Sequence, residues 1–217
     1  MRSSYYAITV LSFIAFLRGN SFGQLNSQAS KQKTKPALFK RYFDNELKRW
    51  TSSFTNFKLS EFKIADTISF ENSEELDFKT LKSFLSTYKP LITFTKDKNQ
   101  FIDIYSYQLN LEKKGNSYVA NVDIDQAVYL CNLKTRYWGR IFFGGYSRWV
   151  DDIVWISNTK FLLVGSEKGD DYKNRPRIYL GDTIKQSFEE FEDGNKACIQ
   201  SKGYESQKLK NLNIKEL

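Results

Sequence analysis

The sequence contains no histidine, and this absence excludes several classes of enzyme at once. Ser-His-Asp and Cys-His arrangements need an imidazole to accept the proton of the nucleophile, so this chain cannot build either of them. Zinc sites of the HExxH type and haem sites with a histidine ligand are excluded for the same reason. General acid–base chemistry would therefore fall to carboxylates, lysine or tyrosine.

Cysteine, proline and phosphate-binding glycine motifs are also scarce. Two cysteines are too few for a four-cysteine metal site, and the chain has only three prolines. No GxGxxG follows a predicted strand and no GxxxxGK[ST] occurs, so the common phosphate-binding loops are missing. We therefore expect no cofactor and no metal centre. The content of hydrophobic residues, 41%, fits a folded domain rather than a disordered tail.

The first 23 residues have the pattern of an export signal. Ala7 to Leu17 is an apolar run of about 11 residues, which is too short for a membrane span of ~20 residues. Ser21 and Gly23 are small residues suited to a cut before Gln24. We predict a signal peptide at 1–23, a periplasmic or extracellular protein, and no transmembrane segment in the mature chain. A buried helix or an uncleaved anchor are the alternatives, and Arg18 leaves room for the anchor.

The two cysteines are candidates for a disulfide in an oxidising compartment. A bond between Cys131 and Cys198 would close a loop of about 67 residues, worth roughly 4 kcal/mol in the chain-entropy model. Cys131 also lies in a strand-like run that would suit a core thiol. The alternative is therefore a pair of buried free cysteines.

The remaining chain divides by composition and periodicity. Apolar spacings of three and four predict helices at 36–50 and 74–88, and shorter alternating runs separated by turns predict strands from Leu91 onward. We predict an α+β fold in which two N-terminal helices accompany a mainly antiparallel sheet of about seven to nine strands. The predicted parts are a flexible linker (24–35), a helical part (36–90), an antiparallel β region (91–193) and a polar tail (194–217), with 36–200 forming one domain.

A faint repeat occurs in the β region. Val128-Tyr129-Leu130-Cys131-Asn132 is similar to Ile178-Tyr179-Leu180-Gly181-Asp182 at an offset of 50 residues. Together with Asp152-Ile153-Val154-Trp155 and Phe161 to Gly165, this pattern resembles a blade of a β-propeller of the WD-repeat or TolB-like kind, whose repeats have such a period. The resemblance covers 91–193, has room for two blades, and implies a binding platform. The alternative is an ordinary antiparallel sheet whose hairpins recur.

An aromatic and acidic stretch supplies the candidate ligand-binding residues. Tyr146, Trp149, Asp151 and Asp152 follow a Gly-Gly pair that allows a sharp turn or close approach of a ligand. Aromatic faces beside carboxylates are suited to sugar or peptide ligands. The alternative is a plain hairpin connection with its tryptophans in the core.

Three pairs of carboxylates are possible catalysts or metal ligands. They are Asp123/Asp125, Asp151/Asp152 and Asp170/Asp171. A glycosidase needs two carboxylates ~5–10 Å apart, whereas acidic residues at turns usually bond to nearby backbone. The last pair lacks the spacing of a dedicated calcium loop. We assign no catalytic residue and no metal ligand.

The formal net charge of +8 is concentrated near the N-terminus. Residues 31–63 hold nine lysines and arginines against three acidic residues. The aromatic residues there fall on the apolar stripe of the predicted helix, so we expect no nucleic-acid partner. We predict an exported, non-catalytic binding or interaction protein of the bacterial envelope, with an unknown protein or glycan partner. The alternative is a carboxylate-dependent hydrolase of envelope or extracellular glycans; an inhibitor of another protein is a third possibility.

Overall fold

The computed structural model describes residues 35–72, 75–115, 117–212 and 214–216. All of them belong to one compact unit, Lys33–Leu217. The predicted signal peptide and almost all of the predicted linker lie outside the described residues. The predicted fold class is confirmed: the described chain is mainly antiparallel β-sheet with a few short helices.

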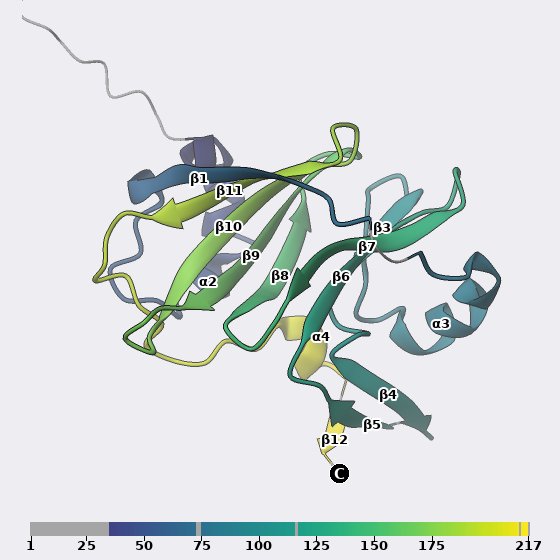
Figure 1. The fold of residues 1–217 in the computed structure, drawn as a ribbon. Coiled ribbons are helices and arrows are strands. Elements are labelled where there is room, and N and C mark those ends of the chain that lie inside the picture. The colour runs from purple at the N-terminus through teal and green to yellow at the C-terminus, as the bar shows by residue number, and fades with distance from the viewer. Residues whose placement is uncertain (1–34, 73–74, 116, 213, 217) are drawn as a thin grey trace, which may run out of the picture. The chain divides into compact units, whose positions relative to one another are not determined.

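Two antiparallel sheets form the centre of the unit (Figure 1). The five-stranded sheet has the order β1-β11-β10-β9-β8, and the four-stranded sheet has the order β2-β3-β6-β7. The strands of the first sheet are β1 (Phe62–Ser69), β8 (Arg148–Trp155), β9 (Lys160–Lys168), β10 (Asn174–Asp182) and β11 (Ser187–Asp193). Those of the second are β2 (Thr93–Phe94), β3 (Gln100–Asp103), β6 (Gln126–Asn132) and β7 (Tyr137–Gly144).

A small third sheet has the order β12-β5-β4. It contains β4 (Leu109–Lys114), β5 (Ser117–Val122) and β12 (Ile214–Glu216), which pairs with β5 in parallel. The sequence predicts one long strand from Phe101 to Leu111, but the chain turns after Asp103. The Asp103 carboxylate accepts hydrogen bonds from the backbone N–H groups of Tyr105 and Ser106 (2.9 and 3.1 Å), which ends the strand.

Alternating side chains give each of the two large sheets two packed faces. Phe161 and Leu163 of β9 face the core between the two large sheets, where they join Val128, Leu130 and others. Leu162 and Val164, the intervening residues, face the N-terminal helices. Because the five-stranded sheet is covered on both faces, β9 is a nearly continuous apolar run rather than an alternating one.

The N-terminal helices cover the outer face of the five-stranded sheet. The predicted helix 36–50 is broken into η1 (Lys35–Phe39), α1 (Lys40–Asp44) and α2 (Lys48–Thr51). Asn45 leaves the helical conformation, and its side chain donates to the Arg41 carbonyl (2.6 Å). The break still leaves the apolar stripe pointing inward, with Trp50 fully buried.

The second predicted helix is shorter than expected. Its core is α3 (Leu81–Tyr88), which follows η3 (Phe78–Thr80). Leu81 packs with Phe101 and Trp138 on the outer face of the four-stranded sheet. Two further short elements are η2 (Leu59–Glu61) and α4 (Gln207–Lys210). Within the described parts of the chain, no helix is long and apolar enough to cross a membrane.

The faint sequence repeat corresponds to two hairpins with the same turn. In β6–β7 and β10–β11, the side-chain oxygen of Asn132 or Asp182 accepts from the backbone N–H groups two and three positions later (3.0 and 3.2 Å; 2.9 and 3.2 Å). Four positions later, Arg136 and Gln186 have φ of 58° and 52°. The offset of 50 residues therefore relates two turns of equal length and hydrogen bonding.

One segment runs along an outer edge of both large sheets. β1 pairs with β11, and the chain then continues to β7, where the backbone N–H groups of Glu71 and Leu76 donate to the carbonyls of Ile141 and Trp138 (3.0 and 2.8 Å). Pairing of these edges leaves fewer free backbone groups for aggregation. The same segment also connects the two recurring hairpins, because it bonds to β11 of one and to β7 of the other.

Candidate functional site

The structure separates Tyr146 from the other candidate ligand-binding residues. Tyr146 is 74% exposed in the turn that joins β7 to β8. Trp149, Asp151 and Asp152 lie on β8, and the two carboxylates contact residues associated with the helical layer. The four residues therefore do not line one shared ligand-binding surface.

A β-bulge determines where Asp151 and Asp152 point. Consecutive side chains on a regular strand face opposite sides of a sheet, but the register of β8 against β9 shifts between Val150 and Asp152. Asp151 accepts from the indole N–H of Trp50 (3.0 Å), and Asp152 accepts from the hydroxyl of Tyr204. Both carboxylates thus meet partners on the helical side of the sheet.

The buried Gln126 holds the bulge from the other sheet. Its side-chain amide donates to the carbonyls of Ile104 and Val150 (both 2.9 Å), and its oxygen accepts from the Val150 N–H (2.6 Å). One side chain therefore satisfies three buried backbone groups where two sheets meet. These hydrogen bonds fix the backbone of Val150, the residue that precedes Asp151.

Burial dominates the electrostatics around Asp151. It raises the pKa of Asp151 to about 7, and the nearby Asp152 charge adds to the increase, whereas hydrogen bonds from Trp50 and Trp149 oppose it. Burial also raises the pKa of Tyr204, with the Asp152 charge acting in the same direction. Asp151 is thus a carboxyl that changes protonation near neutral pH.

The C-terminal segment closes over this part of β8. Besides the contact of Tyr204 with Asp152, the Tyr105 hydroxyl donates to the Ser206 hydroxyl (2.6 Å) and Lys208 bonds to the Thr93 hydroxyl. Burial lowers the pKa of Lys208, while the charge of Asp152 opposes this. The region described from the sequence as a polar tail therefore packs on the sheets.

A basic cleft of about 640 Å³ lies between α2 and this C-terminal segment. Its lining contains four basic side chains, Lys48, Arg49, Lys202 and Lys210, and one acidic side chain, Glu205. Tyr204 also lines the cleft, so the same residue borders the cleft and bonds to Asp152. The sequence indicated the charge of α2 but nothing that would bring Lys202 and Lys210 to it.

In each of the other two acidic pairs, one carboxylate is engaged with nearby backbone or with arginine. Asp123 accepts from the backbone N–H groups of Ile124 and Asp125 (2.6 and 3.3 Å). Asp171 forms two hydrogen bonds with Arg175 (2.8 and 2.9 Å), which hold its pKa down to about 2. Among the described residues, no group of three or more His, Cys, Asp or Glu side chains is placed to hold a metal ion.

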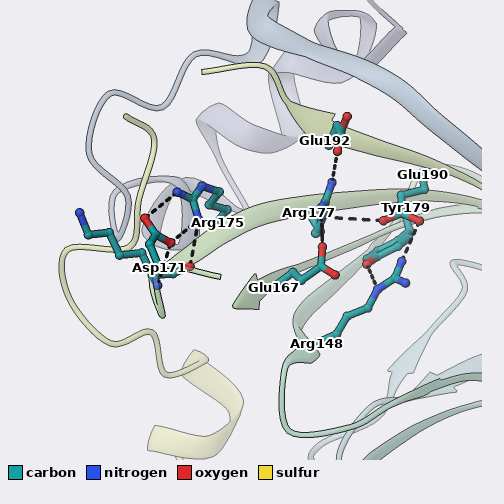
Figure 2. Close-up of polar contacts among 9 residues, drawn as sticks. Arg148, Glu167, Asp171, Arg175, Arg177, Tyr179, Glu190 and Glu192 are labelled. Atoms are coloured by element: carbon teal, nitrogen blue, oxygen red, sulfur yellow. Dashed lines mark hydrogen bonds and ion pairs between the residues drawn. The ribbon is translucent and has the colours of Figure 1, made fainter. Parts of the chain in front are cut away.

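An ion-pair network crosses four strands of the five-stranded sheet, as Figure 2 shows. Glu190 on β11 bonds to Arg148 on β8 (2.7 Å) and lies 3.8 Å from Arg177 on β10. Arg177 in turn bonds to Glu167 (2.7 Å) and Glu192 (2.8 Å). Because its carboxylates and guanidinium groups bond to one another, we interpret this network as structural.

The disulfide that the sequence left open is absent, and both cysteines are buried free thiols. Cys131 on β6 packs under α3, whereas Cys198 packs beside the N-terminal helices, so the two belong to separate apolar clusters. Burial raises the pKa of each thiol to about 12. The second alternative, two core cysteines, is therefore the one that the structure has.

No family model, curated protein or solved structure matches this chain.

Proposed function

We propose that this chain is an exported, non-catalytic binding protein whose ligand carries several negative charges. The observation that supports this proposal is the basic cleft, in which four cationic side chains face a single acidic one. Residues from α2 and from the C-terminal segment meet there, so the positive charge is a product of the fold. A concave surface with convergent charges of one sign attracts a ligand of the opposite sign.

Two of the cleft lysines are available to a ligand. Arg49 donates to the side chain of Gln207, and Lys210 lies 3.7 Å from Glu205. Lys48 and Lys202 are exposed and have no ion pair with another described residue. Each exposed ion pair contributes only ~0–1 kcal/mol, so useful affinity requires a ligand that contacts several of these groups.

The proposal predicts salt-sensitive binding of polyanions. Purified protein should bind inorganic tripolyphosphate or vesicles containing phosphatidylglycerol, and a rise from 50 to 500 mM salt should weaken binding by about fivefold or more. Tripolyphosphate represents a soluble polyanion and the vesicles an anionic membrane surface. Binding of tripolyphosphate alone would identify the ligand as a soluble polyanion, and binding of the vesicles alone would identify it as an anionic membrane surface.

A matched pair of variants tests the cleft itself. K48A/K202A should weaken binding by about tenfold, whereas K113A/K185A, which removes the same charge from exposed positions outside the cleft, should not. Equal losses in both double variants would indicate attraction by overall charge. That result would contradict the proposal.

The alternative of a carboxylate-dependent hydrolase has less support. Asp151 and Asp152 accept hydrogen bonds from Trp50 and Tyr204, which are internal partners, so neither carboxylate is presented to a substrate. If glycan-degrading activity were found and D151N abolished it while leaving the fold intact, this alternative would replace the first.

Export and the resemblance to propeller blades also belong to the proposal. The equivalent hairpins β6–β7 and β10–β11 support the resemblance over 91–193, because each ends a four-stranded run of neighbouring antiparallel strands. Export rests on residues 1–23 of the sequence. The mass of the protein recovered from the envelope or medium tests it, since cleavage before Gln24 leaves a chain that begins at that residue.

A further inference from the structure

A second pocket, of about 330 Å³, lies between the two recurring turns. Its apolar base contains Phe70 and Leu130, both of which are buried. Above them the lining includes four carboxamide side chains, those of Asn72, Gln100, Asn132 and Gln186. The β6–β7 turn, the β10–β11 turn and the segment after β1 all contribute, so the site exists only because two distant hairpins meet.

The chemistry of this pocket differs from that of the basic cleft. None of its lining residues is charged, and hydroxyl groups of Thr135, Tyr137 and Thr183 accompany the carboxamides. The exposed side chain of Ile184 adds an apolar edge. Uncharged donors and acceptors over an apolar base suit a ligand that has many hydroxyl groups and apolar C–H faces.

Several of the carboxamides keep donors for such a ligand. The oxygen of Asn132 is used by the turn, and the oxygen of Asn72 accepts from the Tyr137 hydroxyl (2.9 Å). Within the part of the chain that the structure describes, the NH₂ groups of these two side chains donate no hydrogen bond. The same holds for the carboxamide of Gln186, which is exposed on the second turn.

We propose that this pocket binds a neutral saccharide of one or two sugar units. Its volume is near the lower end of the range of ~300–1,000 Å³ for small-molecule sites. An ionic ligand would gain no charged partner here, and an extended peptide would exceed the pocket. This pocket shares no lining residue with the basic cleft. Saccharide binding here can therefore be tested independently of the function proposed above.

The two equivalent turns supply a matched test. N132D keeps the oxygen that caps the turn, as Asp182 does in the other hairpin, but replaces the free NH₂ donor by a charged oxygen. D182N makes the reverse exchange at a residue that does not line the pocket. Both variants should fold, and Q186E offers a second way to remove a donor from the pocket.

Binding is measured by ligand-observed NMR and calorimetry with glucose, galactose, N-acetylglucosamine and maltose, and with glucuronate as a charged probe. We expect the wild-type protein to bind at least one neutral sugar more tightly than glucuronate. N132D and Q186E should weaken that binding by about tenfold, whereas D182N and the cleft variant K48A/K202A should not. Absence of binding to all four sugars, or equal binding by N132D and the wild-type protein, would overturn the proposal.

Discussion

Substitution of Asp151 by asparagine should reduce the pH dependence of stability between pH 5 and 8. Burial raises the pKa of this carboxyl from its ordinary value of 3.8 to about 7. Between these two values the folded protein holds a proton that the unfolded chain releases. The free energy of unfolding therefore decreases as pH rises toward 7. Asparagine resembles the protonated carboxyl and carries no charge at any of these pH values.

The size of the effect follows from linkage. Each pH unit between 5 and about 7 costs about 1.4 kcal/mol, and little more is lost above the pKa of the folded state, so the full shift would cost roughly 3 kcal/mol between pH 5 and 8. Asp151 is partly exposed, so we expect on the order of 2 kcal/mol. Histidine, the side chain that usually titrates in this interval, is absent from the chain, so no imidazole adds to the pH dependence.

The assay is urea unfolding at pH 5 and pH 8, followed by tryptophan fluorescence. The wild-type protein should be less stable at pH 8 than at pH 5, and D151N should lose about 2 kcal/mol less over the same interval. The control is D44N, which removes an exposed carboxylate on α1 that pairs with Lys40. If D151N and the wild-type protein lost equal stability between pH 5 and 8, the reasoning about the buried carboxyl would be refuted.

Three further predictions concern the packing of the sheets. Q126L should lower the free energy of unfolding by about 2–4 kcal/mol in urea titrations, because three buried backbone groups lose their partner; a loss below ~1 kcal/mol would contradict this. E190A should cost about 2–3 kcal/mol, and E192A, whose side chain is 53% exposed, less than ~1 kcal/mol; equal losses would show that burial does not govern the network. Iodoacetamide should modify neither cysteine in the native protein and both after unfolding, as read by mass; modification of the native protein, or no modification without reductant, would argue against buried free thiols.

The fold class could be predicted because local patterns carry it. Apolar alternation and turn residues located most strands, and the offset of 50 residues between Asn132 and Asp182 marked two turns that prove to be equivalent. Boundaries were less predictable. The helix predicted at 36–50 breaks at Asn45, and the strand predicted from Phe101 to Leu111 breaks after Asp103, because side-chain hydrogen bonds compete there with regular structure.

The candidate site was less predictable than the fold. Tyr146 and Asp151 are near in sequence, but a turn and a bulge send them to different surroundings. Conversely, Lys48 and Lys202 are far apart in sequence and line one cleft. Neither a bulge nor a meeting of distant segments leaves a periodic signal in the chain.

Missing imidazoles and apolar periodicity are local properties, so they can be read directly from the order of the residues. Which charges and carboxamides meet depends instead on how distant segments pack. Long-range packing turned a polar tail into one wall of a basic cleft and brought two similar turns around a neutral pocket. It also separated the two cysteines into different clusters. These outcomes depend on contacts between residues far apart in the chain, and no single segment encodes them.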